Sequence, residues 1–261
     1  MVDHPERPPI SIEPITEEPW VRLGTGSSLR DWNKTDEIAY NQNNRQTEKL
    51  WFFRQVFDFL TDNRVNGDYY EFGCHRCRTF RMALAEARRH NVTDMKFIAF
   101  DSFKGLPDVA EKSAVEFWQR GALSTSEDSF LQMVREHRIY VDRVKTVPGF
   151  YDCSLTPQLQ EAFLAEERNI SLVNVDCDLY ESAVPVFKFI EPLLQEGAVI
   201  YIDDMFAGFK GNPNKGVARA FIEYRNKSRW NFVRHMDIGW WGRSYIVYPS
   251  DGGAPPATAA L

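Results

Sequence analysis

Four aspartates stand in two close pairs, each directly after a short apolar segment. They are Asp176, Asp178, Asp203 and Asp204. If the two segments are neighbouring strands, the four carboxylates meet in one place and repel one another strongly. Capping of the helices that follow explains one acid after each strand, for instance Asp178, but not two. A hard divalent cation with oxygen ligands would offset the charge, so the pattern predicts a metal site.

Two further acids and a glycine are suited to binding a nucleoside. Gly73 follows the segment Asp68–Phe72 and would let the backbone approach a ligand closely. The helix after it would point its positive end at a carboxylate. Asp101 follows the next apolar segment, where an acid can accept both hydrogen bonds of a ribose diol. A lone Asp after a strand is more often a helix cap, but together with Glu71 and Gly73 at this spacing it predicts nucleoside binding.

The elements that must position these residues alternate along the chain. Five short segments, mostly rich in β-branched or aromatic residues, are each followed by a turn with Gly, Pro or Asp, and we predict them to be strands. They are Asp68–Phe72, Lys96–Phe100, Arg143–Val147, Ser171–Val175 and Ala198–Ile202. The predicted helices between and after them are Thr79–His90, Ser126–His137, Pro157–Glu167, Ser182–Gln195 and Lys215–Lys227. This alternation indicates parallel strands joined by right-handed helical crossovers.

Two more strands, Trp230–Met236 and Arg243–Tyr248, complete the predicted sheet. The connection between them is too short for a helical crossover, so they pair as an antiparallel hairpin. The expected fold is therefore α/β: a seven-stranded, mostly parallel sheet with a C-terminal hairpin and helices on both faces, as in Rossmann-like class I methyltransferases. A helix at Asn44–Leu60 is expected to cover the sheet or to form part of an oligomer contact.

The composition is ordinary for a globular protein and argues against several partners. The length of 261 residues suits one sizeable core. A formal net charge of −6 gives no reason to expect nucleic acid or an anionic membrane as a partner, and no apolar run approaches the ~20 residues of a membrane helix. Residues 1–20 lack the apolar core of a secretory signal, so we expect a cytoplasmic protein. The expected organisation is a partly irregular N-terminal extension (1–43), a methyltransferase domain (44–249) and a flexible tail (250–261).

These segments resemble the macrocin O-methyltransferase family, metal-dependent enzymes that methylate sugar hydroxyls on glycosylated natural products. The likeness runs in order from about Asp68 to Tyr224. Its most specific parts are Asp-Ser-Phe-Lys-Gly-Leu-Pro from Asp101 and Asp-Cys-Asp-Leu-Tyr-Glu-Ser from Asp176. The other matching segments are Tyr70–Gly73, Pro148–Asp152 and Ile202–Asp204.

The resemblance implies S-adenosylmethionine as methyl donor, Mg²⁺ as the metal and a hydroxyl of a small molecule or glycan as acceptor. The residues implied to contact S-adenosylmethionine are Glu71, Gly73, Asp101, Ser102, Gly149 and Phe150. Asp176, Asp203 and Asp204 would hold Mg²⁺, and Asp178 would be the catalytic base; which of Asp176 and Asp178 is ligand and which is base stays open. A Lewis acid and a carboxylate base suit a sugar hydroxyl, which is a poor acid. The resemblance also implies a lid near Pro107–Thr125 and a homo-oligomer.

Two other functions compete with this one. Cys74 and Cys77 form a Cys-x-x-Cys pair that opens a helix after a strand, as in thiol-disulfide oxidoreductases, although that function leaves the aspartates unexplained. The loop Cys74–Thr79 also lacks the further glycines usual in the family, which would narrow the methionine end of the cofactor site. A non-catalytic protein that binds S-adenosylmethionine or acts as a scaffold therefore stays open as an alternative.

Overall fold

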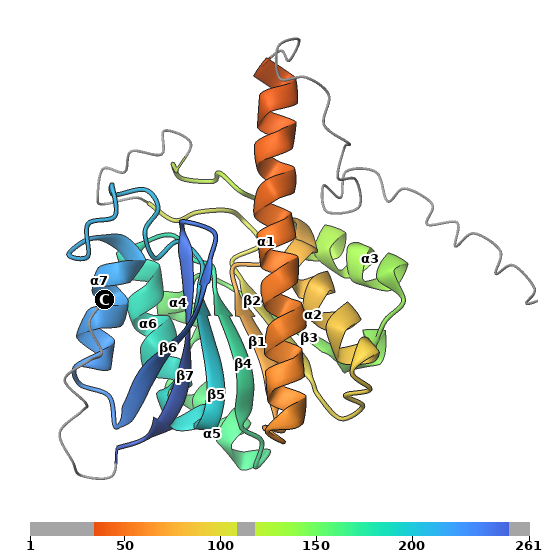
Figure 1. Cartoon of the computed structure of the whole chain (residues 1–261), viewed down its shortest axis with the longest axis vertical. Coiled ribbons are helices and arrows are strands. Elements are labelled where there is room, and N and C mark those ends of the chain that lie inside the picture. The colour runs from red at the N-terminus through yellow and green to blue at the C-terminus, as the bar shows by residue number, and fades with distance from the viewer. Residues whose placement is uncertain (1–33, 109–117, 251–261) are drawn as a thin grey trace, which may run out of the picture.

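The computed structural model describes residues 34–108 and 118–250, in which seven strands form a single sheet. The strands are β1 (Asp68–Phe72), β2 (Phe97–Asp101), β3 (Val144–Pro148), β4 (Ile170–Val175), β5 (Leu194–Ile202), β6 (Trp230–Ile238) and β7 (Gly242–Pro249). Their order in the sheet is β3-β2-β1-β4-β5-β7-β6 (Figure 1). Strands β1 to β5 run parallel, and β7 pairs antiparallel with both β5 and β6. The predicted sheet with its C-terminal hairpin is thereby confirmed.

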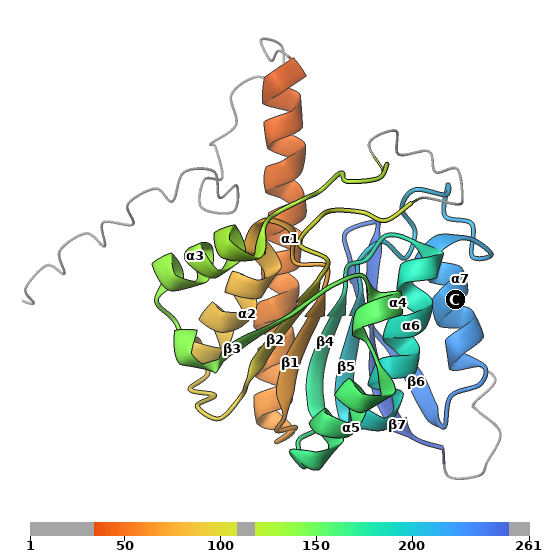
Figure 2. The same ribbon diagram turned by 180° about the vertical axis from the view of Figure 1, so that it is seen from behind.

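Helices cover both faces of this sheet, as predicted. On one face lie α1 (Lys34–Asp62), α2 (Arg78–Arg89) and α3 (Glu127–His137), in front in Figure 1. On the other face lie α4 (Tyr151–Ser154), α5 (Pro157–Ala165), α6 (Tyr180–Ile190) and α7 (Gly216–Arg225), as Figure 2 shows. Three short 3₁₀ turns complete the described part: η3 (His75–Cys77), η4 (Val141–Arg143) and η5 (Glu191–Leu193).

The alternation of side chains along β1 explains the two hydrophobic cores. Successive side chains of a strand point to opposite faces, so Tyr69 packs toward α1 and α2 while Tyr70 packs toward α5. The ring of Tyr69 lies 6.1 Å from that of Phe53, and the ring of Tyr70 lies 5.4 Å from that of Phe163. All five residues of β1 are buried. Both faces of β1 are therefore covered, and its two carboxylates, Asp68 and Glu71, are buried with its aromatic residues.

Two predicted helices have different limits in the structure. The helix expected at 182–195 is α6, which ends at Ile190, and β5 begins at Leu194, so the predicted end was wrong. Pro192 accounts for this, because it has no N–H to donate and its ring clashes with the preceding helical turn. The helix expected from Asn44 begins at Lys34. Most of the predicted extension and tail fall in residues 1–33 and 251–261, outside the described residues, and the domain limits stay predictions.

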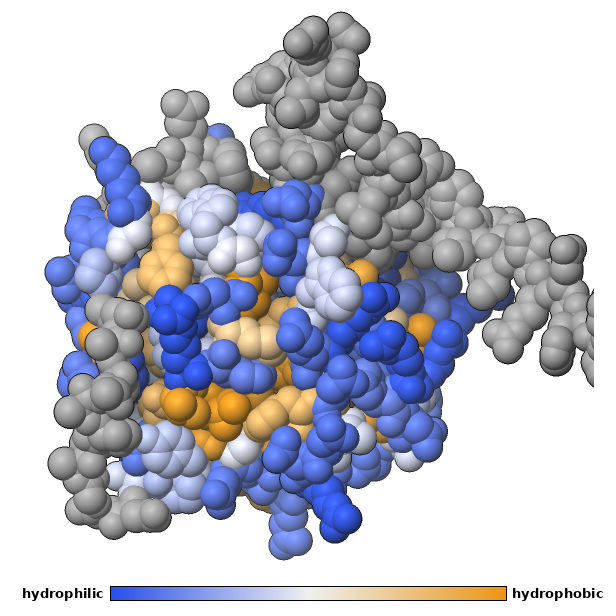
Figure 3. Space-filling model, in the orientation of Figure 1, coloured by the Kyte–Doolittle hydropathy of each residue, from blue (hydrophilic) through white to orange (hydrophobic). Residues whose placement is uncertain are grey.

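One region of the sheet lies open beside α1. Figure 3 shows hydrophobic residues, in orange, gathered over the hairpin strands on the face that Figure 1 presents. Val233 of β6 is 48% exposed there, and Trp51 on the outer side of α1 is 54% exposed. Among the helices of the described residues, none combines the length and the apolar character needed to cross a membrane.

Candidate functional site

A cavity of about 1040 Å³ opens at the carboxyl ends of the parallel strands. The chain places β2 on one side of β1 and β4 on the other, and ligands of open α/β sheets bind at such a switch in strand order. Five of the six residues predicted to contact the cofactor line this cavity, as do all four aspartates. The cavity-lining residues from these two sets are Gly73, Asp101, Ser102, Gly149, Phe150, Asp176, Asp178, Asp203 and Asp204.

Gly73 is required by the backbone around it. Its φ is +91°, and a Cβ at this position would lie 1.8 Å from the carbonyl oxygen of Asp176. The loop after β1 therefore passes directly against the loop after β4, which only glycine permits. Since Asp176 donates its own N–H to the carbonyl of Phe72 (2.8 Å), the two strand ends form one rigid edge of the cavity.

Asp101 joins the loops that follow β1 and β2. Its Oδ2 accepts the backbone N–H of Cys74 at 2.7 Å, and its Oδ1 accepts that of Phe103 at 2.6 Å. Burial raises the pKa of Asp101, although these two hydrogen bonds favour its charged form. The hydroxyl of Ser102 donates to the carbonyl of Gly105 at 2.7 Å. Asp101 thus holds this wall of the cavity together, besides facing the space in which a ligand would lie.

Glu71 lies beneath the cavity instead of in its wall. It is fully buried, and its carboxylate accepts hydrogen bonds from the hydroxyls of Tyr69 and Thr79, the latter at 2.8 Å. Burial raises its pKa to about 7. Thr79 does line the cavity, in the first turn of α2. Glu71 thus supports that turn from below and does not itself line the cavity, and its expected contact with the cofactor stays a prediction.

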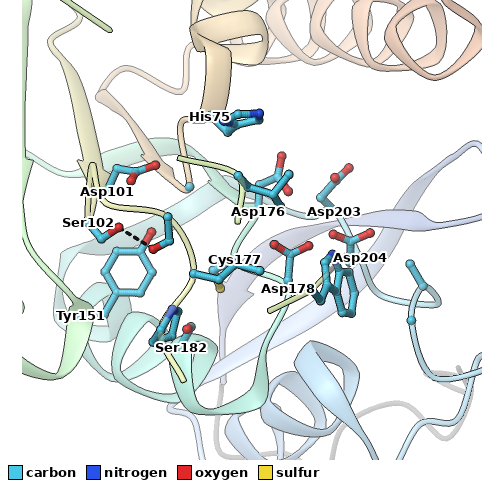
Figure 4. A pocket seen from close by; sticks show the side chains of 18 of the residues that line it. His75, Asp101, Ser102, Tyr151, Asp176, Cys177, Asp178, Ser182, Asp203 and Asp204 are labelled. Carbon is cyan, nitrogen blue, oxygen red and sulfur yellow. Dashed lines mark hydrogen bonds between the residues drawn. The ribbon is translucent and has the colours of Figure 1, made fainter. Parts of the chain in front are cut away.

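The register of β4 and β5 brings the two aspartate pairs together. Val175 is paired with Ile202, so Asp176 and Asp203 leave the sheet side by side. Asp178 has a φ of +58°, an uncommon conformation for a residue with a side chain, and it turns back toward Asp204. Figure 4 shows the four carboxylates in one group, with Asp101 and Ser102 on the other side of the cavity.

The four carboxylates lie close enough to disfavour one another's ionisation. One oxygen each of Asp176, Asp178 and Asp204 lies within 4.8 Å of the others. Burial and the neighbouring carboxylates raise the pKa of Asp176 and of Asp178 well above the usual value of an aspartate. Both causes disfavour the charged form of a carboxylate. A divalent cation bound by these oxygens would favour that form.

Asp203 is held differently from the other three. Its Oδ1 accepts hydrogen bonds from the hydroxyl of Tyr201 and from Nε1 of Trp241, the second at 3.1 Å. Its Oδ2 accepts one from the ammonium of Lys49 at 2.7 Å. Burial would raise the pKa of Asp203, but Lys49 and Arg45 together lower it below the usual value. Asp203 is therefore ionised and fixed in orientation.

Two cations from α1 complete the site, and sequence reasoning missed both. Lys49 is 7% exposed and also lies 3.3 Å from Oδ2 of Asp176. One turn earlier, the guanidinium of Arg45 lies 3.6 Å from Oδ1 of Asp204 and 4.6 Å from the ring of Trp241. A signal existed in the sequence: Lys49 stands where the apolar stripe of the helix, which includes Phe52 and Phe53, would call for an apolar residue.

The Cys-x-x-Cys pair does not have the surroundings of a redox site. Cys74 and Cys77 are free thiols, 2% and 0% exposed. Burial raises the pKa of both thiols well above the usual value, whereas reactive cysteines have a lowered pKa and some exposure. Both instead pack in the core beneath α2.

Part of the predicted lid can be placed. Leu106 and Gly121 are joined by a backbone hydrogen bond of 2.9 Å, so the two ends of this segment lie side by side. Trp118, also in this segment, lines the cavity and is 8% exposed. Residues 109–117 of the expected lid lie outside the described residues, and its role stays a prediction.

Comparison with known sequences identifies relatives over most of the chain. The sequence model of the macrocin-O-methyltransferase (TylF) family matches residues 30–242. A demethyldecarbamoylnovobiocin O-methyltransferase from Streptomyces niveus is 25% identical over 163 residues, which is 60% of each chain. An 8-demethyl-8-(2,3-dimethoxy-alpha-L-rhamnosyl)-tetracenomycin-C 4'-O-methyltransferase from Streptomyces olivaceus is 27% identical over 146 residues. That match covers 54% of this chain and 53% of the relative, so the chain spans little more than half the length of these two proteins.

Solved structures share the fold. The O-methyltransferase NovP superimposes with a TM-score of 0.60 at 23% identity, covering 76% of this chain and 79% of that protein. CalS11, a calicheamicin methyltransferase, superimposes with a TM-score of 0.61 at 18% identity, covering 86% of this chain and 98% of that protein. These likenesses confirm the Rossmann-like methyltransferase fold expected from the sequence.

Proposed function

This chain belongs to the macrocin O-methyltransferase family, and we propose that it transfers a methyl group from S-adenosylmethionine to a hydroxyl of a sugar or related natural product. The observation that carries the proposal is that one cavity has Asp101 and Ser102, which suit a nucleoside, on one side and the four aspartates on the other. The first side suits the ribose of the methyl donor, and the carboxylates suit an acceptor hydroxyl that must lose a proton. The relative from Streptomyces olivaceus, whose named substrate carries a rhamnosyl group, agrees with this acceptor class.

S-adenosylmethionine is proposed to lie along the ends of β1, β2 and β3. Asp101 would receive the ribose diol, Gly73 and Ser102 would face the nucleoside, and Gly149 and Phe150 would flank the adenine. Phe150 is 36% exposed at the cavity, which leaves its ring open to stacking. The first turn of α2, supported by Glu71, would meet the methionine end with its positive dipole.

Mg²⁺ is proposed to lie among the aspartates of β4 and β5. Their donor set fits it, because four buried or half-buried carboxylates lie together and hard oxygen ligands suit this ion; within residues 34–108 and 118–250 the ion pairs of these carboxylates are with Lys49 and Arg45. Asp176, Asp203 and Asp204 are the proposed ligands, with Asp178 as the base. The grouping of Asp176, Asp178 and Asp204 oxygens makes Asp178 the alternative third ligand.

The chemistry follows from this arrangement. When bound, Mg²⁺ would polarise the acceptor hydroxyl, and S-adenosylmethionine would supply the methyl group across the cavity. Asp178 would take the hydroxyl proton as the new oxygen–carbon bond forms and the sulfur–carbon bond breaks. Asp178 lines the cavity beside Asp176 and Asp204, which suits a group that must reach the acceptor hydroxyl. The fixed edge formed by Gly73 and Asp176 would keep donor and acceptor in line.

The acceptor side of the cavity is aromatic. Trp240, at the turn of the β6–β7 hairpin, is 69% exposed and lines the cavity, and Trp118 lines it from the segment after β2. Flat apolar side chains suit a sugar face or the ring system that carries the sugar. Self-association, which the family resemblance implies, stays a prediction that light scattering of the full chain would test.

Two measurements test the proposal. Calorimetry of the full chain with S-adenosylmethionine, in chelator and in Mg²⁺, is expected to show cofactor binding, and methyl transfer to a glycosylated acceptor is expected to stop in chelator and resume with Mg²⁺. Cofactor binding without transfer to any hydroxyl acceptor would instead favour the non-catalytic alternative. Full transfer in excess chelator would remove the metal from the proposal.

Two variants separate ligand from base. Asp203→Asn is expected to raise the Mg²⁺ concentration needed for half-maximal transfer, because a ligand loses its charge. Asp178→Asn is expected to lower turnover by roughly 10²–10⁴-fold with little change in Mg²⁺ demand. Asp142→Asn, an exposed change outside the cavity, serves as the control. An exchange of the two behaviours would make Asp178 the ligand.

A further inference from the structure

The ammonium of Lys49 lies between Asp176 and Asp203, two of the four carboxylates of the cluster. It donates to Oδ2 of Asp203 at 2.7 Å and lies 3.3 Å from Oδ2 of Asp176. Lys49 is 127 residues from Asp176 and 154 from Asp203 along the chain, so only the packing of α1 on the sheet brings them together. Its neighbours Phe52 and Phe53 are buried against the sheet and fix that packing.

The same face of α1 is open to whatever the cavity holds. Arg45, Gln46 and Lys49 all line the cavity. Gln46 is 6% exposed, and within residues 34–108 and 118–250 its Oε1 has no hydrogen-bond partner. The ion pair of Arg168 with buried Asp68, at the other end of β1, does not border this cavity.

The charges of the cluster depend on Lys49 for their balance. Taking an ammonium out of water is costly, and only close carboxylates offset that cost. The carboxylates in turn need the ammonium, because without Lys49 the side chains of Asp176 and Asp203 would repel each other with no cation between them. Arg45 is more exposed and forms its ion pair with Asp204, at 3.6 Å, so it does not lie between Asp176 and Asp203. A divalent cation bound by the aspartates would offset the same repulsion.

We propose that Lys49 is a positioning residue of the metal site: it is the resident cation that holds Asp176 and Asp203 together while no divalent ion is bound. This rests on the proposed Mg²⁺ site. Lys49 and the ion then have overlapping roles in holding the cluster, so a chain without Lys49 depends on the ion to keep this part of the fold together. The wild-type chain does not depend on it to the same degree.

Melting temperatures of the full chain test this without any acceptor. In chelator, Lys49→Met is expected to melt about 10 °C below wild type, because the buried carboxylate of Asp203 and the half-buried one of Asp176 lose their partner. Excess Mg²⁺ is expected to raise the melting temperature of Lys49→Met about twice as much as that of wild type. Lys49→Arg keeps the cation and is expected to respond to Mg²⁺ as wild type does.

Arg54→Met is the matched control. Arg54 is on the same helix and pairs with buried Glu86 at 3.5 Å, away from the cavity. Arg54→Met is expected to lower the melting temperature but to leave its increase with Mg²⁺ at the wild-type value. The control therefore shows how a change that only destabilises the fold behaves. Equal Mg²⁺ shifts in wild type and Lys49→Met would overturn the proposal.

A double variant keeps the test open if Lys49→Met does not fold. Removing the partner charge as well, in Lys49→Met with Asp203→Asn, is expected to restore folded protein in chelator. Failure of that rescue would also overturn the proposal. Because these measurements need neither turnover nor an acceptor, their outcome is separate from that of the methyl-transfer assay, on which the proposed function depends.

Discussion

Asp101 both joins two loops and lines the cavity, so the structure predicts that Asp101→Ala lowers the free energy of unfolding as well as the affinity for S-adenosylmethionine. The carboxylate accepts the N–H groups of Cys74 and Phe103, at 2.7 and 2.6 Å. These bonds tie the loop after β1 to the loop after β2, and both loops form the wall proposed for the cofactor. Alanine leaves both amides without this acceptor and both loops without their connection.

The magnitude follows from the two hydrogen bonds. A hydrogen bond to a charged group contributes about 1.5–3 kcal/mol, so the pair contributes about 3–6 kcal/mol. Asp101 lines the open cavity, so water can reach the freed amides, and the loss is expected at the lower end, about 3 kcal/mol. For a chain of this size that corresponds to a fall of about 6–12 °C in melting temperature.

Urea unfolding of the wild type and Asp101→Ala measures this loss, and calorimetry measures the affinity for S-adenosylmethionine. Asp108→Ala is the control, since Asp108 also lines the cavity but pairs with Arg120 while both side chains are exposed, by 83% and 78%. Such a pair contributes about 0–1 kcal/mol. An unfolding free energy for Asp101→Ala within about 0.5 kcal/mol of wild type would refute the reasoning.

Three further predictions concern the same edge of the sheet. Burial raises the pKa of Glu71 to about 7 in the folded protein, against 4.5 ordinarily, so the fold binds this proton more tightly than the unfolded chain does. The stability that this proton contributes is present below pH 4.5 and is lost as the pH rises through about 7. The melting temperature of wild type is therefore expected to fall over this range, and that of Glu71→Gln is expected to fall less. An unchanged dependence of melting temperature on pH in Glu71→Gln would contradict this. Gly73→Ala is expected to abolish cofactor binding and to melt well below Gly121→Ala, a control with a φ of +76° but no atom within 4 Å of the new Cβ. In thiol labelling of the native chain, Cys153 is expected to react, whereas the three buried cysteines are not. Rapid labelling of a second thiol would contradict the burial of Cys74, Cys77 and Cys177.

Much of the fold was readable from local pattern. β1 was predicted from its aromatic residues Tyr69, Tyr70 and Phe72 and from the glycine that follows it, and its limits agree with the prediction. The hairpin followed from a connection too short for any other pairing. Pro192 marked the end of α6, a signal that the prediction of a helix to Gln195 did not use. Each of these features is decided by residues that lie close together in the sequence, so the sequence alone is enough to predict it.

The site was readable only in part. That Asp101, Asp176 and Asp203 would stand at strand ends followed from the apolar segments before them. Their distances depend on strand order and register, for example on the pairing of Val175 with Ile202, which the alternation of strands and helices leaves undetermined. Whether Glu71 faced the cavity or the core was likewise open, because a strand buried on both faces gives no sign of which side meets a ligand.

The sequence by itself determined which carboxylates stand at the edge of the sheet; the tertiary structure decided how their charge is balanced. Lys49 reaches Asp176 and Asp203 because α1 packs across the sheet through Phe52 and Phe53. Hydrophobic packing of this kind is non-directional and fixes contacts between residues far apart in the chain. An ammonium among buried carboxylates is therefore a product of that packing, and no spacing along the sequence specifies it.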